Sequence, residues 1–255
     1  MRLRPTNLFL TIIIWGVAWN ISADAAFDRL SYATQVWCGI GFSSSPSEPA
    51  THRFFSTFSK PFTAPTLTEH FISYRFRLGT PFKVEIETDW QQFGTQTYAE
   101  DLQTLAVTIS KAQFDLQARV DRFQLRIDNF GQRSTFGLAV GAKWRIRPSF
   151  TTTLLVSRLN KPQLPSILSP TFSGSLQIQV QSNAELVLGL LDRRLTVAVD
   201  FHPHPNLSLH AGGFSFPSQL VYGFGFGNNR LNIGYRQHSH SQLHGTHQFS
   251  LAVGF

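Results

Sequence analysis

The sequence predicts an all-β fold, an antiparallel transmembrane β-barrel of about 14 strands, with 12 strands as the alternative. From residue 66 onward, apolar and polar residues alternate in segments of about 8–12 residues, separated by turns rich in Gly, Pro, Asn and Ser. Charged residues make up only 15% of the 255 residues, against roughly 25% in soluble domains. The mean hydropathy is −0.08, and repeated apolar runs of about 20 residues are absent, which excludes a bundle of membrane-spanning helices.

The N-terminus has the pattern of a secretory signal peptide over residues 1–25. Arg2 and Arg4 form a basic start, residues 8–19 are almost entirely apolar, and Ala23-Asp24-Ala25 supplies a small-residue cleavage site. The apolar run is too short to span a membrane, which takes about 20 residues. We therefore expect export, followed by an N-terminal segment at 26–65 that holds a periplasmic or plug portion and the first strand. The barrel itself is expected at 66–255.

The clearest strand separates its residues into two faces. Phe82, Val84, Ile86, Thr88 and Trp90 fall on one face, and Lys83, Glu85, Glu87, Asp89 and Gln91 fall on the other. Along the rest of the chain the polar face carries mostly Gln, Ser, Thr, Gly and Asn, where a soluble sandwich would carry many Lys and Glu. In an outer-membrane barrel the apolar face meets lipid and the polar face lines the interior. A sheet in lipid must also close on itself to satisfy its backbone groups.

Three two-residue turns test whether the segments pair as antiparallel hairpins, because both apolar faces must then fall on the same side. The predicted pairs are Phe226 with Leu231 around Asn228-Asn229, Leu190 with Leu195 around Asp192-Arg193, and Ile109 with Phe114 around Lys111-Ala112. The apolar phase changes between Val120 and Phe123, which predicts a β-bulge near Asp121-Arg122.

The strand count and the topology follow from the C-terminus. Counting back gives 13 strands from residue 66, and an even number requires one more, at 51–59 or at 32–42. If the last strand ends in the periplasm, the two longest connections, 93–101 and 160–170, both fall on the outside. Long outer loops and short inner turns are typical of such barrels.

Two sets of residues resemble known families. The closing strand, with Phe249, Leu251, Val253 and the terminal Phe255, resembles the C-terminal signature of bacterial outer-membrane barrels. That resemblance implies recognition by the barrel-assembly machinery. The stretches Phe93-Gly94-x-x-x-Tyr98-x-Glu100 and Leu231-Asn-Ile-Gly-Tyr235 with Leu243-His244-Gly-Thr-His247 resemble the PorV and PorQ barrels, within the wider FadL-like group of long-chain fatty-acid transporters. This second resemblance implies the outer membrane of a Gram-negative cell, and either solute passage or a secretion partner.

Charged side chains gather on the polar faces of two neighbouring strands. The predicted cluster comprises Arg75, Arg77, Lys83, Glu85, Glu87 and Asp89. A three-residue turn at 79–81 would place Arg75 opposite Glu85, and Arg77 opposite Lys83. Such a cluster can select solutes as a charged constriction, or it can fill and stiffen a narrow lumen with ion pairs. Both interpretations remain open.

Other site chemistry is weak in this sequence, so no enzyme, cofactor or metal is expected. No Ser–His–Asp constellation stands out, and His202/His204 and His238/His240 fall at opposite ends of the predicted barrel. Basic residues are scattered, which argues against nucleic acid as a partner. The expected partners are outer-membrane lipid, the assembly machinery and a small hydrophobic solute or a secretion partner. The expected function is solute passage or a role in secretion, and the alternative is a structural or interaction barrel with a plugged lumen.

Overall fold

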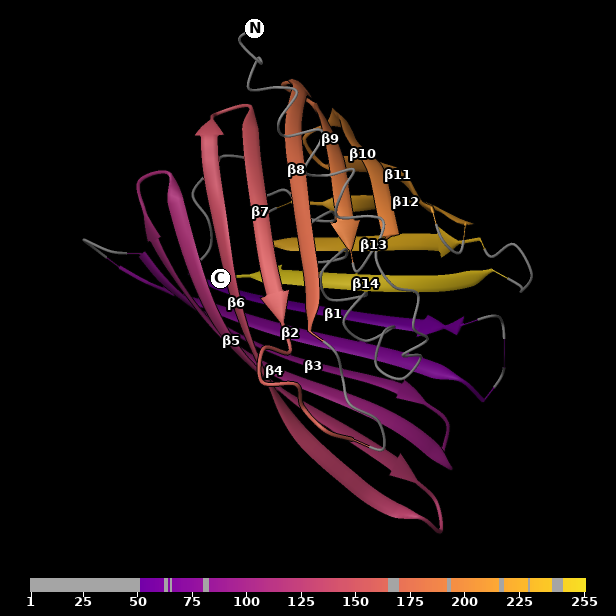
Figure 1. Ribbon diagram of the computed structural model, residues 1–255. Coiled ribbons are helices and arrows are strands. Elements are labelled where there is room, and N and C mark those ends of the chain that lie inside the picture. The colour runs from indigo at the N-terminus through magenta and orange to yellow at the C-terminus, as the bar shows by residue number, and fades with distance from the viewer. Residues whose placement is uncertain are drawn as a thin grey trace, which may run out of the picture.

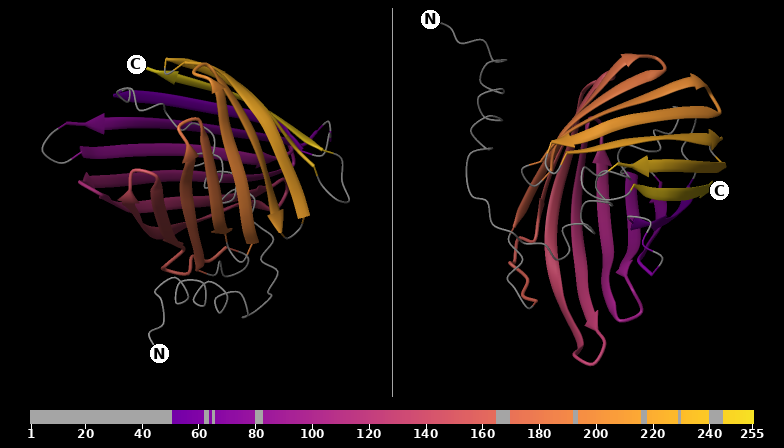
Figure 2. Two further views of the ribbon diagram at one scale, coloured as in Figure 1. Left: turned by 90° about the horizontal axis from the view of Figure 1, so that it is seen from above. Right: turned by 90° about the vertical axis from the view of Figure 1, so that its right-hand side faces the viewer.

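A computed structural model describes residues 51–255, with gaps at 62–63, 65, 80–82, 165–169, 192–193, 216–217, 229 and 240–244. It is a closed antiparallel barrel of 14 strands, in which β1 pairs with β14 (Figures 1 and 2). The predicted fold class is therefore confirmed, and the first strand matches the additional strand expected at 51–59. The signal peptide and 32–42 lie outside the described residues. Among the residues described, no helix has the length and hydropathy of a membrane span.

Each strand pairs with its neighbours in the sequence, and the first pairs with the last. The strands are β1 (His52–Lys60), β2 (Thr68–Leu78), β3 (Lys83–Gly94), β4 (Tyr98–Lys111), β5 (Phe114–Ile127), β6 (Gly131–Arg147), β7 (Phe150–Ser157), β8 (Thr171–Gln181), β9 (Ala184–Leu191), β10 (Arg194–His204), β11 (Leu207–Ser215), β12 (Ser218–Gly227), β13 (Leu231–His238) and β14 (Thr246–Gly254). In Figure 1, β7 to β9 on the near wall cross β1 to β4 on the far wall steeply. Strong tilt of this kind is how a closed sheet accommodates its strand twist.

The two ends of the barrel differ in their connections. The three longest connections, 61–67, 158–170 and 239–245, all leave one end, which we call the long-loop end. The opposite end holds the turns 79–82, 112–113, 148–149, 182–183, 205–206 and 228–230, together with the C-terminus, and we call it the short-turn end. This asymmetry has the form expected of outer-membrane barrels, whose outer loops are longer than their periplasmic turns.

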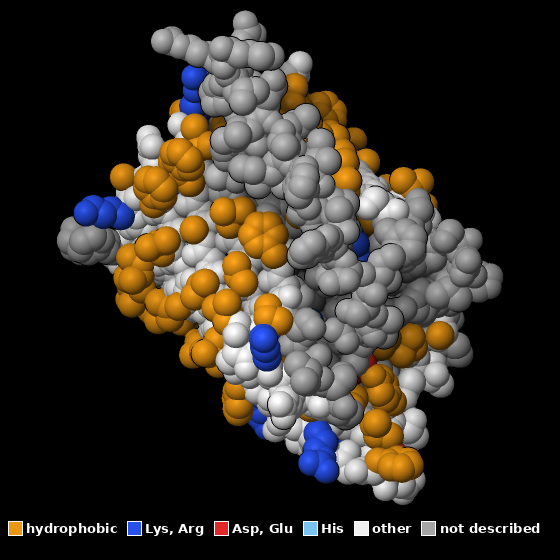
Figure 3. Space-filling model, viewed as in Figure 1, with side chains coloured by type: hydrophobic (Ala, Val, Ile, Leu, Met, Phe, Trp, Pro, Cys, Tyr) orange, Lys and Arg blue, Asp and Glu red, His pale blue; other side chains and the backbone are white. Residues whose placement is uncertain are grey.

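The outer face of the wall is apolar and the inner face is polar or small. Leu138 and Val140 of β6 are 46% and 51% exposed, whereas Ala139 between them is 2% exposed. Near the short-turn end, the rings of Phe114 and Trp144 stack on the outer face at 5.5 Å. Figure 3 shows hydrophobic side chains over much of the described wall, with few Lys or Arg among them. The period-2 assignment of faces from the sequence is thus confirmed.

The predicted hairpin registers are right at one turn and wrong by two residues at two others. Leu190 faces Leu195, as predicted. In contrast, Phe226 faces Ile233, because Asn228 Oδ1 accepts the N–H groups of Arg230 and Leu231 and so lengthens the turn. The observed pairs around the third turn are Ile109 with Leu116 and Lys111 with Phe114, and Ala112 takes the positive φ of 49° that the tight turn requires. A slip of two residues leaves every side chain on its predicted face.

The bulge predicted near Asp121-Arg122 is wrong. β5 pairs with β4 and β6 in continuous register through this region, with Asp121 opposite Thr104 and Gly137. The apolar phase changes because Phe123 points into the barrel, where it is buried, whereas Val120 points out. The strand is regular, and it is the inner face that changes from polar to apolar.

Candidate functional site: the barrel interior

A polar cavity of about 860 Å³ occupies the interior from the middle of the barrel to the short-turn end. Its lining comes from β1 to β10, mostly from their inner faces. Cationic side chains outnumber anionic ones in this lining, and they include Arg53, Lys83 and Lys143. A polar space of this size can admit a small solute.

The structure brings the predicted charge cluster together on one wall of this cavity, but with different partners. Arg75 Nε lies 2.7 Å from Glu87 Oε1, and Arg77 Nη2 lies 2.7 Å from Glu85 Oε2. The predicted pairing of Arg75 with Glu85, and of Arg77 with Lys83, is therefore wrong by two residues. The connection at 79–82 is longer than the three-residue turn on which that pairing rested. Each arginine consequently meets a carboxylate.

The remaining members of the predicted cluster also reach the cavity. Lys83 and Asp89 line it, on the same face of β3 as Glu85 and Glu87. Ser73 Oγ donates to Glu87 Oε1 at 3.4 Å. The two arginines of β2 thus face two glutamates of β3, and these pairs neutralise most of the charge on this wall.

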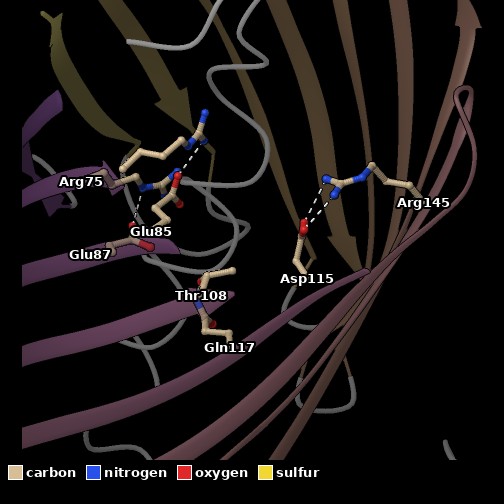
Figure 4. A network of polar contacts seen from close by, with 8 residues as sticks. Arg75, Glu85, Glu87, Thr108, Asp115, Gln117 and Arg145 are labelled. Carbon is tan, nitrogen blue, oxygen red and sulfur yellow. Dashed lines mark hydrogen bonds and ion pairs between the residues drawn. The ribbon is translucent and has the colours of Figure 1, made fainter. Parts of the chain in front are cut away.

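A second ion pair faces the same space from the other wall (Figure 4). Arg145 of β6 donates from both terminal nitrogens to Asp115 of β5, at 3.0 and 2.8 Å. Gln117 Nε2 donates to Thr108 Oγ1 at 3.3 Å, closer to the middle of the barrel. Bidentate pairs of this kind hold the guanidinium in a fixed plane. The cavity therefore has ion pairs at two places on its wall, between β2 and β3 and between β5 and β6.

A buried layer of polar contacts on β4, β5 and β7 borders this cavity on its long-loop side. Asp121 is 1% exposed and accepts hydrogen bonds from Thr104 Oγ1 at 2.8 Å and from Arg119 Nη2 at 2.9 Å. Arg119 Nη2 also donates to Ser157 Oγ at 3.1 Å. Ser157 belongs to β7, so Arg119 crosses the inner face of β6, where the small Ala139 leaves room. The layer ties β4, β5 and β7 together.

Beyond this layer, toward the long-loop end, the interior holds an apolar cluster beside buried polar side chains such as Gln91 and Glu100. Leu102 and Phe123 form a buried cluster with Phe93, Leu125 and Leu164 packed against it. Arg158 follows β7 with a positive φ of 59°, and its guanidinium lies 5.7 Å from the centre of the Phe123 ring. We call these six residues the apolar layer. Along β5 the inner face thus changes from Asp115 and Arg119 at the cavity to Phe123 and Leu125 here.

A hydrogen-bonded chain of three side chains lies on the inner faces of β10 and β11. His210 contacts Asp200 through Nδ1 and Ser208 Oγ through Nε2, the latter at 3.0 Å. Sequence reasoning missed this chain, although Ser208 and His210 share a face of one strand. A two-residue turn at 205–206 would put Ala211 opposite Asp200, but a bulge between Phe201 and His204 moves His210 there. No pattern in the sequence marks that bulge.

The closing strand also lies where it was expected. Phe249, Leu251 and Phe255 are exposed on the outer face, and Val253 is half-buried beside them. In the ranges that the structure describes, no three His, Cys, Asp or Glu side chains come together as a metal site.

Comparison with known proteins adds information on the fold. No family model matches the chain, and no curated protein matches its sequence. Among solved structures, the CymD monoaromatic hydrocarbon channel is similar with a TM-score of 0.58 at 10% identity, over 94% of each chain. Mutants of the porin of Rh. blastica match with a TM-score of 0.47 at 7% identity, over 80% of this chain and 98% of the porin. At 10% identity, the likeness to CymD concerns the shared barrel fold.

Proposed function

We propose that this protein is an outer-membrane channel that passes small, largely apolar solutes. The observation that carries the proposal is the order of zones inside the barrel. The apolar layer around Phe123 lies toward the long-loop end. The polar cavity of about 860 Å³ lies between it and the short-turn end. A solute that enters from the long-loop end would pass this apolar cluster before it reaches the polar cavity.

The outer face supports a location in a lipid bilayer. On β6 the apolar outward residues run from Phe136 to Ile146, and on β5 from Phe114 to Val120. Nine to eleven tilted residues are enough to cross an outer membrane. The connections are longer at one end than at the other, which supports placing the long-loop end outside the cell. The resemblance to FadL-like barrels, and the likeness to a hydrocarbon channel, agree with an apolar solute.

The test is passage through reconstituted protein. Full-length protein in planar bilayers should give discrete conductance steps, and vesicles that contain it should take up toluene faster than empty vesicles. Phe123→Ala should increase the uptake rate, because it removes the largest ring of the apolar layer. Phe224→Ala, which removes an exposed ring on the outer face, is the matched control and should leave uptake unchanged. Wild-type protein that neither conducts nor speeds uptake would favour the plugged structural barrel or a secretion role.

A further inference from the structure

Arg53 of β1 lines the polar cavity beside two other arginines. It lies directly opposite Arg75 of β2, and Arg77 is the next inward residue along β2. On its other side it lies opposite Gly254 of β14, which has no side chain. In the part of the chain that the structure describes, no carboxylate lies within ion-pair distance of the Arg53 guanidinium. Arg53 therefore has a like charge on one side and no charged side chain directly opposite it on the other.

Two of the carboxylates on this wall already have a cation each. They belong to β3, which β2 separates from β1. Glu87 Oε1 lies 2.7 Å from Arg75 Nε (Figure 4). Glu85 Oε2 likewise lies 2.7 Å from Arg77 Nη2.

The wall as a whole has a surplus of positive charge. Among the described residues that line the cavity on β1 to β3, four are cationic, namely Arg53, Arg75, Arg77 and Lys83, and three are anionic, namely Glu85, Glu87 and Asp89. One positive charge thus has no counterpart on its own wall.

An arginine in this position favours a bound anion. Like charges directly opposite each other in an antiparallel pair destabilise the sheet, and arginine cannot relieve the repulsion by losing its proton. Arg53 is half-buried, so water screens that repulsion only in part. An anion between the guanidiniums of Arg53 and Arg75 would replace the repulsion with attraction.

The wall also indicates the kind of anion. Two of its three arginines hold a carboxylate, and the planar fork of a guanidinium matches the two oxygens of that group. The surplus of one positive charge suits a ligand with a single negative charge. Leu155 and Val187 line the same cavity, so it offers apolar surface for the body of a small organic ligand.

A solute can reach Arg53 without crossing the apolar layer. The cavity lining includes Lys83, the first residue of β3, and Ala112, in the turn between β4 and β5. Both residues lie at the short-turn end, so the cavity extends to the rim of the barrel there. Its volume of about 860 Å³ lies in the range of pockets that enclose small organic ligands.

We propose that Arg53, together with Arg75 and Arg77, forms a binding site for small organic monocarboxylates at the short-turn end of the lumen. Arg53 donates hydrogen bonds to the carboxylate oxygens of the ligand. Arg75 and Arg77 add positive charge while each keeps its own glutamate. The site is reached from the short-turn side, so it does not depend on passage of a solute through the whole barrel.

The test is isothermal titration of full-length protein in detergent with benzoate, and with benzyl alcohol as its uncharged analogue. Benzoate should bind saturably with one ligand per protein. Benzyl alcohol should bind at least about tenfold more weakly, because it lacks the charge that the guanidinium recognises. Arg53→Gln should weaken benzoate binding at least about tenfold for the same reason. Arg147→Gln is the matched control; it removes an exposed arginine of β6 outside the described lining of the cavity, and it should bind benzoate as the wild type does.

Urea unfolding in lipid vesicles separates binding from a structural role of Arg53. Without benzoate, Arg53→Gln should unfold at the same urea concentration as the wild type or at a higher one, because it loses a like-charge contact. Benzoate should raise the midpoint of the wild type and of Arg147→Gln, since a ligand of the folded state stabilises it, and should leave that of Arg53→Gln unchanged.

Wild-type protein without saturable benzoate binding overturns the proposal, and so does equal affinity for benzoate and benzyl alcohol. Equal benzoate binding by the wild type and Arg53→Gln overturns it as well, because the site would then lie elsewhere. All of these measurements are made without passage across a membrane. Conductance and toluene uptake therefore decide the channel proposal separately.

Discussion

His52, the first residue of β1, and Phe255, the last residue of the chain, exchange two backbone hydrogen bonds. His52 N donates to Phe255 O at 2.9 Å, and Phe255 N donates to His52 O at 3.0 Å. Their rings also stack at 5.4 Å with an angle of 9° between the planes. The chain terminus therefore takes part in the seam between β1 and β14 that closes the barrel.

Deleting Phe255 should impair assembly of the barrel while leaving export intact. The deletion removes both hydrogen bonds and the ring contact at the seam, and it removes the terminal residue of the predicted assembly signal. Phe255→Ala keeps the two backbone hydrogen bonds. If the seam contacts matter more than the assembly signal, this variant should assemble better than the deletion variant. Heat-modifiable protein in outer-membrane fractions measures assembly. If the deletion variant assembles normally, the terminal residue has no role in closure or recognition.

Breaking the buried pair of Arg119 and Asp121 should cost far more stability than breaking the partly exposed pair of Arg77 and Glu85. Asp121→Asn leaves the Arg119 guanidinium without its carboxylate in a layer where Asp121 is 1% exposed. Breaking a buried pair in this way costs about 3–5 kcal/mol. Glu85→Gln should cost less than about 1 kcal/mol, because water screens that pair. Urea unfolding in lipid vesicles compares the two; equal costs would contradict the layered interior.

The sequence predicts the barrel well because alternation has a period of 2, which assigns Val84 and Leu138 to one face without any knowledge of register. Register is harder to predict, since a slip of two residues leaves that alternation unchanged, and the turn at Asn228 depends on an Asx side chain. The site is harder still. Phe123 changes the chemistry of an inner face, and the pairing of His210 with Asp200 depends on one bulge. Both features arise from tertiary packing.

Gly137→Ala should destabilise the apolar layer. A Cβ atom at this position would lie 2.8 Å from Phe123 Cε2 and 3.7 Å from Pro162 Cγ, so the packed ring must move. Overpacking of this kind costs about 1–3 kcal/mol. The double variant Gly137→Ala with Phe123→Leu should recover part of that cost, because the smaller side chain vacates the space. Additive costs in the double-mutant cycle would show that the two positions do not interact.

Position 140 offers the sharpest test of the lipid-facing surface. Val140 lies four residues from Phe136 and four from Trp144, and all three point outward on β6. It therefore lies near the middle of the apolar band. Ser134 points outward on the same strand, two residues beyond Phe136 and so past the apolar residues.

Val140→Arg should lower the free energy of unfolding in lipid by about 2–4 kcal/mol, the cost of a basic side chain at the bilayer midplane. Ser134→Arg should cost only about 0–1 kcal/mol, because a residue beyond the apolar band reaches the interface and its water. Both variants add one arginine to the same face of one strand, so the difference between them isolates depth. Urea titration in vesicles of defined thickness measures it. Equal costs at the two positions would mean that this face is not in contact with lipid.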